Sequence, residues 1–170
     1  MAGEDFGAFA ASAWPRLYRS MYAVARDGRD AEDAVQTALA DAHRHWPRVS
    51  AAGDPLAYVR RMALNALLAE RRRPRFTREV SRAAPAEHLA APADVAGESD
   101  TRVTVLDALR DLPPRQRAVV VLRYYDDLSE AQIADALGCR PGTVKSQAAA
   151  ALATLRRTLG TPDLAEEDTR

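Results

Sequence analysis

The side chains with the clearest chemical potential lie in residues 129–147, SEAQIADALGCRPGTVKSQ. Ser129 and Gln132 have the spacing of a capping box, in which each side chain pairs with a backbone N–H at a helix N-terminus. Gly138 stands where a tight turn needs a positive φ, and Pro141 can begin a second helix. Near its N-terminal end that helix would expose side chains able to bond base edges and phosphates: Arg140, Thr143, Lys145, Ser146 and Gln147. The segment therefore predicts a helix-turn-helix that enters the major groove of DNA.

The alternative for this segment is an ordinary helical hairpin with solvated polar residues. Against it, Ala134 is small where the second helix must cross closely, and Val144 is spaced to pack on Ile133 and Leu137. This combination of small residue, turn glycine and apolar residue is what a helix-turn-helix requires, so we favour DNA binding.

A second basic segment precedes this one. The formal net charge of the chain is zero, yet residues 60–82 hold eight Arg against two Glu, a local charge of +6. Residues 83–100 carry −4 and residues 161–170 carry −3, and such asymmetry is more informative than the total. Asn65 could hydrogen-bond a base edge, and nearby Arg side chains could bind phosphates: Arg60, Arg61, Arg71, Arg72, Arg73 and Arg75. The alternative is a solvated basic helix end.

Two aromatic residues, Trp46 and Tyr58, flank the loop expected at 47–54. Aromatic rings can stack on an unpaired base. The alternative places both rings in the core, and for Trp46 this is the favoured interpretation.

Acidic side chains are concentrated on the helix expected between Asp30, a candidate N-cap, and Trp46. The apolar residues of this helix follow a helical period, which leaves Glu32, Asp33 and Gln36 on other faces.

No residue set points to catalysis, a metal or another cofactor. His43, His45 and His88 lack a nucleophile partner or a set of metal ligands. Cys139 is the single cysteine, which precludes an internal disulfide and is typical of a reducing cytoplasm. No apolar run approaches the ~18 residues that indicate a membrane span. We expect a cytoplasmic protein that is not an enzyme.

The elements expected around these residues are all helical. Helices are predicted at 5–25, from Asp30 to Trp46, and from Pro55 to about Arg73, where Pro74 stops the last of them. Residues 77–100 lack an apolar period and are rich in Ala and Pro, which predicts a flexible linker. Further helices are expected around Leu106 and after the Pro113–Pro114 pair, with a buried stripe formed by Ala118, Val121, Leu122 and Tyr125. The fold class is all-α, with two small helical domains.

Taken together, these segments resemble a sigma-70 family RNA polymerase sigma factor of the extracytoplasmic-function (ECF) class. DAEDAVQTALADAHRHW (30–46) and PLAYVRRMALNALLAERRR (55–73) resemble region 2, and LRDLPPRQRAVVVLRYYDDLSEAQIADALGCRPGTVKSQ (109–147) resembles region 4. The resemblance implies region 2 at 6–76, a linker at 77–100, region 4 at 101–159 and an acidic tail at 160–170.

The resemblance also implies roles and partners. The partners would be core RNA polymerase, promoter DNA and an anti-sigma factor, and the function would be promoter-specific transcription initiation. Region 2 would dock on polymerase through Asp30, Glu32, Asp33 and Gln36. At the −10 element it would act through Arg60, Arg61, Asn65, Arg71, Arg72 and Arg73, with loop 47–54 receiving a flipped base. The −35 element would be bound by Arg140, Thr143, Lys145, Ser146 and Gln147.

The chain departs from the family pattern at two places. Arg140 stands where relatives often have Ser or a similar cap, and Ala148–Ala150 stand where they often have Arg. Because alanine cannot bind phosphate, weak affinity for the −35 element is expected. The competing hypothesis is a stand-alone transcriptional regulator, which would need a dimer to span two half-sites.

Overall fold

The computed structural model describes residues 2–25, 27–70 and 100–160, and every regular element within those ranges is a helix. The first half contains α1 (Ala2–Val24), α2 (Gly28–Arg44), α3 (Trp46–Ser50) and α4 (Pro55–Glu70). The second half contains α6 (Asp100–Asp111), α7 (Pro114–Tyr124), α8 (Glu130–Leu137) and α9 (Pro141–Leu159). The predicted all-α class is confirmed.

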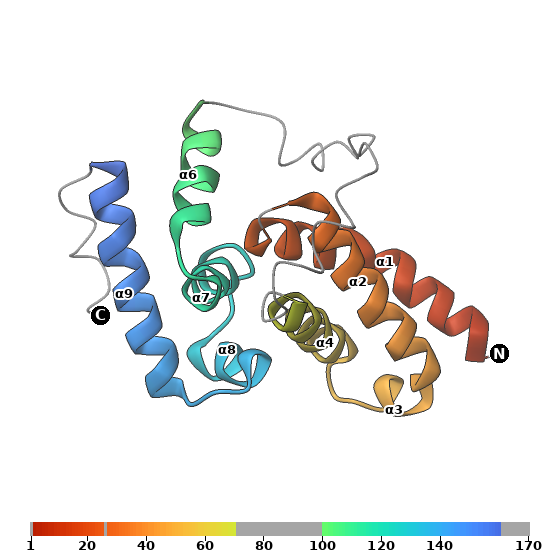
Figure 1. The fold of residues 1–170 in the computed structure, drawn as a ribbon. Coiled ribbons are helices and arrows are strands. Elements are labelled where there is room, and N and C mark those ends of the chain that lie inside the picture. The colour runs from red at the N-terminus through yellow and green to blue at the C-terminus, as the bar shows by residue number, and fades with distance from the viewer. Residues whose placement is uncertain (1, 26, 71–99, 161–170) are drawn as a thin grey trace.

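The first half is a helical bundle in which α1 and α4 both pack on α2 (Figure 1). The periodic residues of α2 form its buried face as predicted, and most of them are alanines, which permit close helix approach: Ala31, Ala34, Val35, Ala38, Leu39 and Ala42. Trp46 is buried, with its ring centroid 5.2 Å from that of Phe6 and 5.0 Å from that of Phe9. Trp46 is therefore a core residue and is not placed to stack on a base.

Two local expectations for the first half are wrong. The N-cap of α2 is Asp27 rather than Asp30, because the backbone N–H of Arg29 donates to Asp27 Oδ1 at 2.6 Å. Residues 47–54 are not all loop, since α3 extends to Ser50 and buries Val49. Asp54 caps the start of α4, since its Oδ1 accepts a 2.9 Å hydrogen bond from the Ala57 N–H.

The second half contains the predicted helix-turn-helix. The Ser129 N–H donates to Gln132 Oε1 at 2.9 Å, and the Gln132 N–H donates to Ser129 Oγ at 3.3 Å, so the capping box is complete. Gly138 ends α8 with φ 61°, and α9 begins at Pro141. Val144 is fully buried in the same cluster as Ile133. Tyr125, expected in the buried stripe, is 49% exposed because α7 ends at Tyr124.

The turn at Gly138 gives the first prediction. Gly138→Ala should lower the free energy of unfolding by about 1 kcal/mol, because a Cβ strains a left-handed residue. Nothing lies within 4 Å of the added Cβ, so the cost comes from the backbone alone. Gly142→Ala, inside α9 and equally open, should be neutral or stabilising since alanine favours helix. Thermal or urea unfolding of the two variants checks this, and equal destabilisation would contradict it.

The two halves pack directly on each other. Helix α4 contacts α8, and α1 contacts both α6 and α7 (Figure 1). The predicted linker lies outside the described residues except for Asp100, which is the first residue of α6. The predicted tail lies outside them except for Gly160, which is the C-cap of α9.

Candidate nucleic-acid and polymerase interfaces

The recognition end of α9 presents a polar surface. Arg140, Thr143, Lys145 and Ser146 are exposed and Gln147 is half-buried. Within this surface the Ser146 hydroxyl donates to the Thr143 carbonyl at 3.0 Å. The structure thus places all five predicted −35 residues on the first two turns of α9 or at its N-cap.

One acidic residue, Glu130 at the start of α8, borders this surface. Its Oε2 lies 3.7 Å from Lys145 Nζ, and its Oε1 lies 3.4 Å from Arg123 Nη1. Sequence reasoning missed this ion pair, which spans the turn between the two helices.

The alanine run after Gln147 divides between core and surface. Ala148 is buried, whereas Ala149 and Ala150 are exposed. Ala148 is therefore a packing residue, and only the two following alanines leave a surface position without a charged side chain.

Helix α4 carries the described part of the predicted −10 surface. Asn65 is exposed, and Arg61 is about half-exposed with Nη1 3.0 Å from Asp135 Oδ1 of α8. Arg60, in contrast, is only 8% exposed. Tyr58 is half-buried and packs against the core. Arg71, Arg72 and Arg73 lie outside the described residues, as does Arg75.

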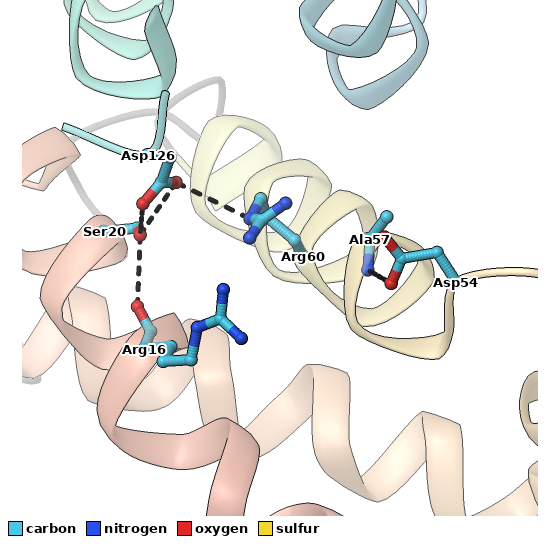
Figure 2. A network of polar contacts seen from close by, with 6 residues as sticks. All are labelled: Arg16, Ser20, Asp54, Ala57, Arg60 and Asp126. Atoms are coloured by element: carbon cyan, nitrogen blue, oxygen red, sulfur yellow. Dashed lines mark hydrogen bonds and ion pairs between the residues drawn. The ribbon is translucent and has the colours of Figure 1, made fainter. Parts of the chain in front are cut away.

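A buried polar cluster surrounds Arg60 (Figure 2). Asp126, in the segment after α7, places Oδ2 3.5 Å from Arg60 Nε. The Ser20 hydroxyl on α1 donates to the same carboxylate, with Oγ 2.6 Å from Oδ1 and 2.9 Å from Oδ2. Burial raises the pKa of Asp126, while the Ser20 hydrogen bond and the charges of Arg60 and Arg16 oppose that rise. Elements from both halves of the chain build this cluster.

The predicted polymerase-facing residues share the N-terminal part of α2. Asp33 and Gln36 are exposed, and Asp30 and Glu32 are half-buried. The Gln36 amide donates to Glu32 Oε1 at 2.9 Å.

An aromatic row on α1, which sequence reasoning missed, lies beside these acids. Trp14, Tyr18 and Tyr22 are partly buried and have successive ring centroids 6.2 and 6.0 Å apart. Burial raises the pKa of Tyr18, and nearby Tyr22, Glu32 and Asp27 raise it further. The i, i+4, i+8 spacing of the three rings was the signal that could have identified the row.

Within the described ranges, no cluster of three or more His, Cys, Asp and Glu side chains is arranged to hold a metal ion. None of the described helices is long and apolar enough to cross a bilayer.

Among the described elements, a capped helix-turn-helix with an exposed polar recognition end is the architecture used by many DNA-binding domains. Two family matches make the class specific: residues 11–77 match Sigma-70 region 2, and residues 102–155 match Sigma-70 region 4. The RNA polymerase sigma-E factor of Streptomyces coelicolor is 40% identical over 150 residues, covering 87% of this chain and 82% of that protein. The ECF RNA polymerase sigma factor SigM of Mycobacterium tuberculosis is 35% identical over 145 residues, covering 85% and 72%.

A solved structure gives the same fold. The sigma factor RpoE of Bartonella quintana, crystallised with the anti-sigma factor NepR, has a TM-score of 0.72 and 22% identity, covering 94% of this chain and 99% of that one. The chain belongs to the sigma-70 family and to its ECF class. It is therefore a sigma factor, a subunit that directs RNA polymerase to initiate transcription at promoters. The stand-alone regulator is not favoured.

Proposed function

We propose that three separate surfaces of this chain divide the work of promoter recognition. The N-terminal end of α9 binds the duplex at the −35 element through Arg140, Thr143, Lys145, Ser146 and Gln147. Helix α4 acts at the −10 element through Arg60, Arg61 and Asn65, with Arg71, Arg72 and Arg73 following it in sequence. The acidic face of α2 docks on core RNA polymerase through Asp30, Glu32, Asp33 and Gln36.

The observation that supports this division is where the exposed residues lie. Lys145 belongs to the second half of the chain, whereas Asn65 and Asp33 project from different helices of the first half. The domain limits proposed for these activities are region 2 at 6–76 and region 4 at 101–159.

The primary test is run-off transcription with purified core polymerase on genomic fragments. The protein should direct initiation at a small set of promoters, and core enzyme alone should not. Failure of the protein to stimulate any promoter, while binding core enzyme normally, would contradict the proposed function.

The second prediction separates the two DNA surfaces. Lys145→Ala should weaken holoenzyme binding to the −35 duplex by about 1 kcal/mol or more, because it removes a charge-assisted contact. Asn65→Ala should leave that binding intact and impair strand opening. Footprinting measures the upstream contact, and permanganate reactivity of unpaired thymines measures opening. If each variant lost both activities equally, the division between α9 and α4 would be wrong.

Two further expectations accompany the family. The relative from Bartonella quintana was crystallised with an anti-sigma factor, which supports an anti-sigma factor as a third partner of this chain. The site of action is proposed to be the cytoplasm, where core polymerase and the chromosome are found, and no catalytic activity is proposed for any residue.

A further inference from the structure

The carboxylate of Glu130 lies between two basic side chains of the helix-turn-helix region. Glu130 is the first residue of α8. Its Oε1 accepts a hydrogen bond from Arg123 Nη1 at 3.4 Å, and its Oε2 lies 3.7 Å from Lys145 Nζ. One acid therefore connects the last turn of α7 to the recognition helix α9. Because Lys145 belongs to the proposed −35 surface, this acid is placed to change how that surface meets DNA.

The two contacts of Glu130 differ in exposure and in kind. The side chains of Arg123 and Glu130 are 28% and 31% exposed, whereas that of Lys145 is 69% exposed. Arg123 also lies over the ring of Tyr124, 5.9 Å from its centroid. Arg123 thus anchors the carboxylate on the protein side. The 3.7 Å separation from Lys145 exceeds hydrogen-bonding distance, so Glu130 offsets the ammonium charge without occupying its N–H donors.

A lysine in this position can serve DNA binding in two ways. As a counterion it attracts phosphates, which carry no sequence information. As a hydrogen-bond donor it can bond the O6 and N7 acceptors of guanine in the major groove. A carboxylate beside the ammonium group weakens the first use, because it offsets the attraction and repels an approaching phosphate. The second use depends on the N–H donors, which stay open.

We propose that Glu130 is a specificity-determining residue of −35 recognition: it suppresses capture of phosphates by Lys145 and so reserves the lysine for base edges. This inference rests on the proposed binding of the −35 duplex by α9. Glu130 acts through Lys145 rather than by contacting a base. Its effect is therefore on the ratio of specific to non-specific binding, and not on affinity alone.

The first test measures non-specific binding of the full-length chain. Glu130→Gln removes the charge and keeps the shape of the side chain. It should bind a fluorescent duplex of random sequence about threefold more tightly than wild type at low salt, which is the effect of one exposed ion pair. The slope of log K against log salt should steepen by up to about 0.9, the signature of one added phosphate contact. Asp111→Asn, the matched control, removes one exposed acid from the end of α6 and should change neither quantity comparably.

The second test measures discrimination by the holoenzyme. Each variant is assembled with core polymerase and bound to a promoter fragment with its −35 element either intact or scrambled. The ratio of the two affinities should fall about threefold in Glu130→Gln, because the gain is mainly on the scrambled fragment. Asp111→Asn should keep the wild-type ratio. In a Lys145→Ala background, Glu130→Gln should no longer lower the ratio, a result that a merely structural role would not give.

A melting curve and a circular dichroism spectrum accompany each variant. Glu130→Gln should match wild type in both, because the Ser129–Gln132 capping box that starts α8 is unchanged. Its side chain is also exposed enough that substitution costs little stability.

The outcomes separate this proposal from the proposed function. Equal affinity of Glu130→Gln and Asp111→Asn for random DNA would overturn the role of Glu130. Equal strengthening on the intact and scrambled fragments would overturn it too, since Glu130 would then repel DNA without regard to sequence. An undiminished effect in the Lys145→Ala background would show that the acid does not act through the lysine. If wild-type holoenzyme fails to distinguish the two fragments, the proposed −35 function fails, whereas the random-duplex measurement still tests Glu130.

Discussion

Asp33→Arg is expected to abolish promoter-dependent transcription while leaving the fold unchanged. Asp33 is exposed on α2, outside the buried alanine face that holds this helix on α1 and α4. Exposed substitutions of this kind change the free energy of unfolding by about 0.5 kcal/mol or less. At a docking surface, in contrast, the introduced arginine would face the positive charge that the aspartate complemented. Like charges opposed across an interface cost several kcal/mol of binding free energy. A solvated face and an interface therefore give opposite results in the same assay.

The measurement is run-off transcription with purified core enzyme, beside a melting curve for each variant. Asp5→Arg is the matched control, because Asp5 is also exposed near the N-terminal end of a helix of the first half. It should retain wild-type transcription. Wild-type activity from Asp33→Arg would remove this face of α2 from the polymerase interface, and loss of activity in both variants would indicate a general charge effect.

The features predicted correctly from sequence are those whose chemistry is local. The capping box of Ser129 and Gln132 and the left-handed Gly138 each depend on atoms within a few residues of one another. The N-cap of α2 shows the limit of such reasoning. Asp27 and Asp30 are both good caps by residue type. The choice of Asp27 extends α2 back to Gly28, where an added Cβ would lie 3.4 Å from Tyr18 Oη and 3.5 Å from Tyr22 Cε2 of α1.

The features that sequence reasoning missed depend on contacts between distant segments. Arg60 precedes the buried Leu64 by four residues, so the helical period places it on the inner side of α4. The partners that complete its enclosure, Asp126 and Ser20, lie on two other segments of the chain. Its neighbour Arg61 has the same residue type and half its side chain in solvent. Arg61 is therefore exposed, as expected for an arginine-rich helix. Arg60 is instead buried beside Asp126 and Ser20.

Arg117 is a buried arginine that a sequence signal could have identified. It precedes Val121 by four residues, so the helical period places it on the inner stripe of α7. The structure buries it completely. Its guanidinium donates to the carbonyls of Val24 at 2.9 Å, Leu112 at 2.7 Å and Arg110 at 3.2 Å. One side chain thus joins the end of α1 to the turn between α6 and α7.

Arg117→Ala should therefore be among the most destabilising single substitutions in the chain, lowering the free energy of unfolding by about 3 kcal/mol. The variant loses charge-assisted hydrogen bonds, leaves buried carbonyls without their donor and opens a cavity in the core. Arg115→Ala, on the exposed side of the same helix, should change stability by about 0.5 kcal/mol or less. Urea unfolding followed by circular dichroism compares the two. Similar midpoints would mean that water replaces the guanidinium at these carbonyls, and that α1 and α7 are held together by their apolar contacts alone.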